Sequence, residues 1–148
     1  MKAVRGRAIF LLLLCVPMLL FCACGILQDA AKLETYDLGN DKIPSLTSVV
    51  GERKVSGVET GSRTGGVQYK NYTYETQTLT EDMDAYYAAL LQSGYLVTKS
   101  SEGNTMKGSL ELGRNSADAG KAILIGLAWD NTLITLSITK GDGTITAT

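Results

Sequence analysis

The sequence predicts an α+β domain: an antiparallel sheet of about six strands, covered on one face by one main helix, with two strands before the helix and four after it. Residues 81–93 carry apolar side chains at helical spacing. Other segments alternate apolar with small or polar residues, as half-buried antiparallel strands do. Short runs rich in glycine, asparagine and aspartate separate these segments and are typical of turns.

The folded domain is expected to begin near Ile43. Pro44 and Ser45 can open a helical turn that runs to Val49 and ends at Gly51. Residues 53–60 and 67–76 follow as a hairpin joined by the glycine-rich run 61–66. Tyrosines occupy both phases of the second strand, so a bulge near residues 70–71 is predicted if they share one face.

The main helix is predicted over Glu81–Ser93. Thr80 is the expected N-cap, and the acidic residues of the first turn interact favourably with the helix dipole. Gly94 is suited to the left-handed position that ends a helix, and Tyr95 then packs back on Leu90.

Four strands are predicted after the helix, at residues 96–100, 105–112, 122–129 and 132–140. Tight turns are expected at residues 102–104 and 130–131, and a polar loop spans residues 113–120. The last two strands alternate isoleucine, leucine and tryptophan with small or hydroxyl side chains, which predicts one buried face for each.

Composition excludes several kinds of chemistry. The chain of 148 residues has no histidine, which removes the commonest general base and the imidazole metal ligand. Of the 14 basic residues, Lys2, Arg5 and Arg7 precede the apolar run; without these three, 11 basic residues face 15 acidic ones, a difference of −4. Such a charge balance argues against nucleic acid as a partner.

The N-terminus has the pattern of a secretory signal peptide. A short basic start precedes an apolar run from Ala8 to Phe21, and all three cysteines lie in or beside that run. The end of the run, FCACG, resembles the lipobox of bacterial lipoproteins, with Cys24 as the lipidated residue, although Phe21 and Cys22 depart from the usual upstream pattern. An uncleaved signal-anchor through Leu27 is the alternative, because the apolar stretch then reaches about 20 residues.

The predicted organisation is therefore a signal peptide at 1–23, a lipid-anchored tether at 24–42 and one α+β domain at 43–148. Beyond Cys24 the chain has no cysteine, so no disulfide or thiolate metal site is expected. No metal and no cofactor is predicted.

Two groups of residues are candidate sites. Aromatic side chains suit wet interfaces, and Tyr72, Tyr74 and Trp129 are the predicted binding face; core packing is the alternative. The second group is acidic: Glu75, Glu81, Asp82 and Asp84 are the densest carboxylates. Helix capping accounts for most of them, while paired carboxylates could also run a hydrolysis or hold Ca²⁺.

The sequence favours a non-catalytic lipoprotein of the cell envelope. We expect it to be anchored in the cell membrane or outer envelope, with its domain outside the cytoplasm. Its predicted partners are the membrane, through the lipid, and a protein, peptide or glycan. The alternatives are a histidine-free hydrolase that uses carboxylates and a purely structural lipoprotein.

Overall fold

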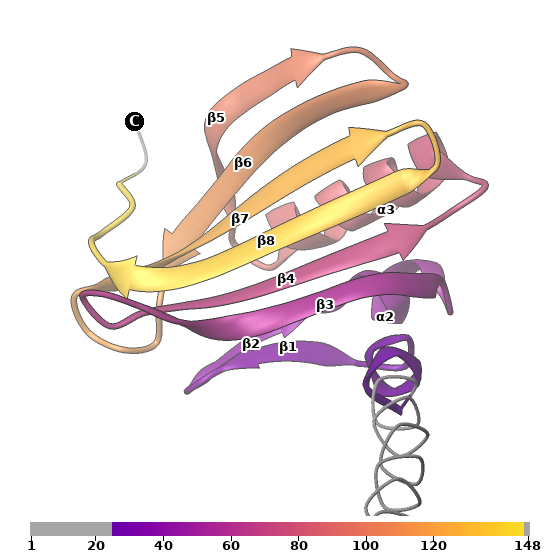
Figure 1. Ribbon diagram of the computed structural model, residues 1–148. Coiled ribbons are helices and arrows are strands. Elements are labelled where there is room, and N and C mark those ends of the chain that lie inside the picture. Colours follow the sequence, from indigo (N-terminus) through magenta and orange to yellow (C-terminus); the bar gives the residue numbers. More distant parts are fainter. Residues whose placement is uncertain (1–24, 147–148) are drawn as a thin grey trace, which may run out of the picture.

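The computed structural model describes residues 25–146, in which the expected α+β fold is confirmed. The predicted signal peptide at 1–23 and Cys24 lie outside the described residues. Six strands form one antiparallel sheet in the spatial order β3-β4-β8-β7-β6-β5, and helix α3 covers one face of it (Figure 1). The elements are β3 (Lys54–Arg63), β4 (Val67–Glu75), α3 (Leu79–Gln92), β5 (Leu96–Gly103), β6 (Lys107–Asn115), β7 (Lys121–Asp130) and β8 (Leu133–Asp142).

The covered face of the sheet changes in character along the strands. Residues paired across antiparallel strands share a face, so the register defines rows that cross the sheet. One end row runs from Tyr74 through Ile134 to Trp129, and the two middle rows are aliphatic in β8, β7 and β6. The row at the opposite end contains Lys140 and Arg114. The inner face is therefore apolar at one end and charged at the other.

Helix α3 begins earlier than the sequence predicted. Its N-cap is Thr78, not Thr80, and the first helical residue is Leu79, whose buried side chain joins the core. The other end is confirmed: Gly94 has φ +83°, and Tyr95 N donates to Leu90 O at 3.1 Å. With the bond from Gly94 N to Leu91 O at 3.0 Å, this forms a Schellman motif, which turns the chain directly from α3 into β5.

The prediction of a tether at residues 24–42 was wrong. Two short strands, β1 (Thr35–Leu38) and β2 (Asp41–Pro44), pair as a hairpin that packs on the sheet. Tyr36, Leu38 and Ile43 are buried. Apolar residues that alternate on both sides of a Gly-Asn turn are typical of a hairpin. These side chains cover part of the inner sheet face.

The chain before this hairpin is also folded against the domain. Residues 25–30 are helical, and Ala30 is buried in the core. Leu27, Ala31 and Leu33 pack against the same core. The described chain is therefore attached to the domain from its first helical turn onward.

The short helix predicted after Pro44 is present as α2 (Leu46–Val50). Its N-cap is Ser45, whose hydroxyl accepts from Ser48 N at 2.9 Å, and Gly51 ends it with φ +84°.

The bulge predicted near residues 70–71 of β4 lies instead in β3, the other strand of that hairpin. Val55 pairs with Tyr74 and Gly57 pairs with Thr73, which leaves Ser56 as the extra residue in β3.

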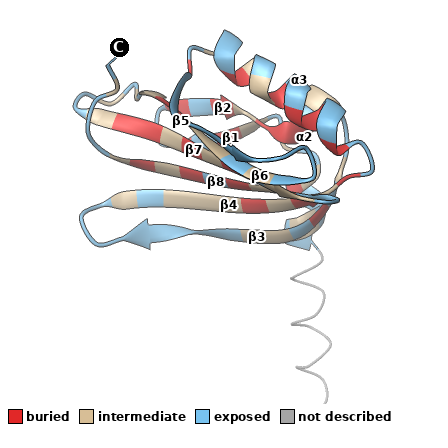
Figure 2. Ribbon diagram, turned by 90° about the horizontal axis from the view of Figure 1, so that it is seen from above, coloured by how far each residue is buried: buried red, intermediate tan, exposed pale blue. Residues whose placement is uncertain are grey.

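Because β4 has no bulge, its tyrosines face both sides of the sheet. Tyr72 and Tyr74 point inward, and Tyr69 is on the outer face, where its hydroxyl donates to Glu59 at 3.1 Å. Buried residues on the sheet face that meets α3, α2 and the β1–β2 hairpin form a single core (Figure 2).

Candidate functional site

A groove of about 350 Å³ lies between α3 and the hairpin formed by β5 and β6. Helix α3 packs over the middle of the sheet, and β5 and β6 extend beyond it (Figure 1). The lining is mainly apolar, with polar side chains at the mouth, and comprises Leu79, Thr80, Met83, Asp84, Tyr87, Val97, Ser101, Asn104, Thr105, Leu110 and Trp129. A cavity of this size and composition is typical of a ligand site.

Trp129 is held in this groove by its neighbours on β6 and the β5–β6 turn. Its Nε1 donates to Asn104 O at 2.8 Å, so the polar group of the indole is already satisfied. Gly108, its partner across the β6–β7 pair, has no side chain to obstruct the ring: a Cβ there would lie 2.5 Å from Trp129 Cζ2. The indole therefore offers an apolar ring surface to the groove.

The helix side of the groove is formed by one stripe of α3. Tyr87 lies one turn after Met83 and Asp84 on this stripe, and all three line the cavity. Asp84 is exposed and is the only charged residue in the lining. Hydroxyl groups of Thr80, Ser101 and Thr105 add neutral hydrogen-bonding capacity at the mouth.

Exposed aliphatic side chains occur on the same elements that form this groove. Six large hydrophobic residues are exposed in the described chain, and four of them belong to α3, β5 or the β5–β6 turn: Leu91, Leu96, Val97 and Met106. Val97 is 45% exposed and Met106 is 55% exposed. β5 is also an edge strand, so one side of its backbone has no partner strand among the described residues. Exposed apolar side chains beside an apolar groove are characteristic of an interaction surface.

Two of the three predicted binding residues are in the core. Tyr74 is fully buried and Tyr72 is 4% exposed, so the prediction that they form a binding face was wrong. Their rings continue a stack that begins at Tyr36, with 4.5 Å between the centroids of Tyr36 and Tyr72. The hydroxyls of Tyr36 and Tyr74 are 2.7 Å apart. Trp129, the third residue, lies in the groove.

Burial controls the acidity of these phenols. Desolvation raises the pKa of Tyr74 to about 12, partly offset by the hydrogen bond with Tyr36. Desolvation likewise raises the pKa of Tyr36. Both phenols therefore stay neutral and act as hydrogen-bonding core residues.

The acidic group of the sequence does not act as one site. Asp82 is buried and accepts two hydrogen bonds from Arg53, each 2.7 Å long, while Glu75 pairs with Lys54 at 2.9 Å. Burial alone raises the pKa of the Asp82 carboxyl, but the bonds from Arg53 and Thr76 outweigh it, so that pKa lies below its usual value. Asp82 is therefore a charged structural partner, and Asp84 alone of the four lines the groove.

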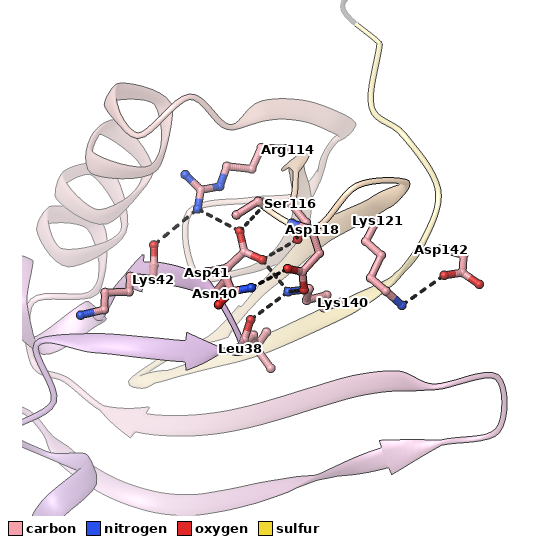
Figure 3. Close-up of polar contacts among 11 residues, drawn as sticks. Leu38, Asn40, Asp41, Lys42, Arg114, Ser116, Asp118, Lys121, Lys140 and Asp142 are labelled. Atoms are coloured by element: carbon pink, nitrogen blue, oxygen red, sulfur yellow. Dashed lines mark hydrogen bonds and ion pairs between the residues drawn. The ribbon is translucent and has the colours of Figure 1, made fainter.

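The opposite end of the inner face holds a closed polar cluster (Figure 3). Lys140, only 3% exposed, donates from Nζ to Leu38 O at 3.0 Å, to Asp41 Oδ2 at 2.7 Å and to Asp118 Oδ2 at 2.6 Å. An ammonium has three donors, and these bonds use all of them. Asp41 also accepts from Ser116 Oγ at 2.5 Å and from Ala117 N at 2.8 Å. The cluster thus ties the β1–β2 hairpin to β8 and to the β6–β7 loop.

Each charge in this cluster is stabilised by its partners. Burial raises the pKa of Asp41, but the hydrogen bonds from Lys140 and Ser116 lower it by more, so the pKa lies below its usual value. Burial lowers the pKa of Lys140, and its bonds to Asp118 and Asp41 more than reverse that effect. These groups are therefore ionised near neutral pH, and each is bonded to its partners. Their role is to hold the fold together.

Within residues 25–146, no cluster of three or more cysteine, aspartate or glutamate side chains could hold a metal ion. In the same part of the chain, no helix is both long enough and apolar enough to cross a membrane.

Comparison with known proteins assigns no family. No protein-family model matches the chain, and no curated protein or solved structure is significantly similar to it.

Several residues of the groove were not identified from the sequence. Val97 and Leu110 looked like ordinary strand residues, and Met83 like a core residue of the helix. One pattern could have pointed to the groove: glycines pair at positions 103 and 108 beside the single tryptophan, which suggests space reserved for a large ring.

Proposed function

We propose that this chain is a lipoprotein of the cell envelope, lipidated at Cys24, whose α+β domain binds a segment of a partner protein without catalysis. The groove between α3 and the β5–β6 hairpin, with its exposed aliphatic rim, is the observation that carries the binding role. The basic start, the apolar run and the residues before Cys24 support export and anchoring.

A protein or peptide suits this surface better than a glycan. Leu91, Val97 and Met106 present large aliphatic surfaces beside the cavity, and glycan hydroxyls lose hydration there without gaining hydrogen bonds. The rim also extends beyond a cavity of about 350 Å³, which favours an occupant larger than a small molecule. A partner segment can fill the groove with one or two side chains and cover the rim with its neighbours.

The hydrolase alternative receives less support. A carboxylate mechanism needs two carboxyl groups on either side of a substrate. Asp84 is the only acidic residue in the groove lining, and the nearby Asp82 is occupied by Arg53.

Anchoring is tested by mass spectrometry of the protein extracted from membranes. The proposal expects an N-terminal peptide that starts at Cys24 and carries acyl mass, because two acyl chains provide stable attachment. Cys24→Ala should abolish the modification, and Cys22→Ala serves as the matched control. An intact Met1 without acyl mass would instead support an uncleaved signal-anchor.

Binding is tested by selecting peptides on the membrane-anchored protein, extracted from membranes and placed in lipid vesicles. A library of random 12-residue peptides is panned, and peptides that bind empty vesicles are removed. Val97→Asp places a charge in the apolar groove and should weaken the selected peptides at least tenfold. Ser137→Asp, at an exposed position of β8 on the opposite sheet face, should leave affinity unchanged. Equal binding to both variants, or no selected peptides, would refute the groove as the binding site.

A further inference from the structure

We propose that the segment bound in the groove carries a lysine or arginine next to its apolar anchor, and that Asp84 holds that cation. The inference rests on the proposed binding function and specifies the chemistry of its partner. It follows from the charges that surround the groove and from the aromatic rings that line it.

Asp84 is the one charged residue that lines the groove. On the neighbouring strands, Lys107 and Asp130 pair at 2.7 Å and Lys99 and Glu102 pair at 3.5 Å, so these four charges already have partners. Asp82, two residues before Asp84, is balanced by Arg53. Asp84 forms no ion pair within residues 25–146, although it lies at the mouth of an apolar cavity. A cationic group on the ligand supplies the complementary charge.

The same charge argues against two other occupants. A fatty acid or an anionic lipid places its negative head near Asp84 if its acyl chain fills the groove. A second copy of this chain that docks through the same corner brings a second Asp84 into a symmetric interface, which adds like charge. A basic and apolar peptide segment has neither disadvantage.

The rings of Tyr87 and Trp129 extend the argument to the kind of cation. Both line the same cavity as Asp84, and Trp129 Nε1 is already bonded to Asn104 O. Aromatic surfaces attract cations, and a planar guanidinium can stack on a ring while it bonds a carboxylate through two N–H groups. Arginine should therefore be preferred to lysine at this position of the ligand.

The test uses the selected 12-residue peptides and the fluorescence of Trp129, the single tryptophan of the chain. Wild-type protein in vesicles is titrated with peptides that depend on Val97. The inference expects arginine or lysine beside an apolar residue in most of them. Replacing that cation by glutamine should weaken binding about two- to fivefold, as should Asp84→Asn in the protein. Added salt should reduce the difference.

Glu81→Gln is the matched control. Glu81 is an exposed carboxylate one turn before Asp84 on α3, it does not line the groove, and its replacement changes the net charge equally. Affinity for the basic peptides should be the same in this variant as in wild type. If Glu81→Gln and Asp84→Asn weaken binding equally, the effect comes from the overall negative charge of this surface. The assignment of the cation to Asp84 is then wrong.

The remaining outcomes separate this inference from the proposed function. Peptides that depend on Val97 but lack a basic residue would refute the cation site and leave the groove as a binding site. The same holds if their affinity is unchanged by Asp84→Asn. A stronger Trp129 response to laurate than to any peptide overturns it in favour of a lipid. Light scattering that shows a dimer disrupted by Val97→Asp overturns it in favour of a second copy. If no peptide depends on Val97, both proposals fail.

Discussion

The two ends of the inner sheet face are built from the same strands but are covered in different ways. At the charged end, Lys140 of β8 is enclosed by the β1–β2 hairpin, and its three donors are satisfied. At the apolar end, Trp129 of β7 lies in a groove that α3 and β5 leave partly open. A buried charge must be fully enclosed by partners, whereas an apolar surface can remain available for one.

This difference suggests a division of roles between the ends. The polar end holds a part of the chain that precedes the sheet, so its residues serve the fold. The apolar end carries exposed aliphatic residues and one unmatched carboxylate, Asp84. Substitutions should therefore destabilise the domain when made at the first end and change binding when made at the second.

The largest effect is expected from Lys140→Met. The substitution leaves Asp41 buried without its closest cation, which should cost about 3 to 5 kcal/mol of unfolding free energy. Urea unfolding of the chain from residue 25 onward, followed by Trp129 fluorescence, measures the loss. The double variant Asp41→Leu with Lys140→Met should regain part of it, because neither charge is then left alone. A loss of unfolding free energy below about 1 kcal/mol in the single variant would contradict the structural role assigned to the charged end.

A comparable but somewhat smaller effect is expected from Leu90→Ala. Leu90 is fully buried between α3 and the sheet, and its truncation should cost about 2 to 5 kcal/mol. Val97→Ala is the matched control on the open side, since Val97 is 45% exposed, and it should cost less than about 1 kcal/mol. The same urea unfolding experiment measures both. Similar losses in the two variants would mean that the groove is part of the core.

A graded, smaller effect is expected from acid. The pKa values of Asp41 and Asp82 are lowered in the folded protein, by Lys140 and Arg53 respectively and against the opposing effect of burial. Their contribution is therefore complete above the ordinary aspartate pKa of about 4 and is lost as the pH falls through the folded-state values. Urea midpoints should be nearly constant from pH 5 to 7 and fall below about pH 4.

Asp82→Asn sharpens this pH test. Because the variant lacks one of the two carboxyls, its stability should be lower at pH 6 and should fall less steeply below pH 4 than that of wild type. Asp84→Asn, which breaks no ion pair of the described chain, is the control at the open end. If Asp82→Asn leaves the acid dependence unchanged, the Arg53 pair does not contribute to it.

Local patterns determined most of the fold. Helical spacing and the glycine after Ser93 identified α3 and its C-terminus, since a Schellman motif depends only on residues close in sequence. Alternation identified the last two strands of the main sheet, and segments bounded by turn residues identified the other four, with ends that shifted by a few residues. The first residue of α3 was misplaced because burial of Leu79, a contact with distant residues, extends the helix.

The candidate site was only partly predictable. Trp129 was identified as a binding residue because of its chemistry, but the same reasoning selected Tyr72 and Tyr74, which are buried. An amphipathic ring suits a core and an interface equally well, so residue type does not distinguish them. β4 itself has no bulge, so its side chains alternate regularly, which places Tyr72 and Tyr74 on the inner face and Tyr69 on the outer face.

The sequence by itself determined the order of the main helix and the six strands of the main sheet, the absence of histidine chemistry and the position of the candidate lipidation cysteine. These properties depend on composition and on neighbouring residues. Only the tertiary structure decided that residues 35–44 cover the core, that Lys140 meets Asp41 and Asp118, and that α3 leaves a groove beside Trp129. Each of these results depends on pairing and packing between distant segments. A linear pattern limits such contacts but does not specify them, because many arrangements bury the same apolar residues.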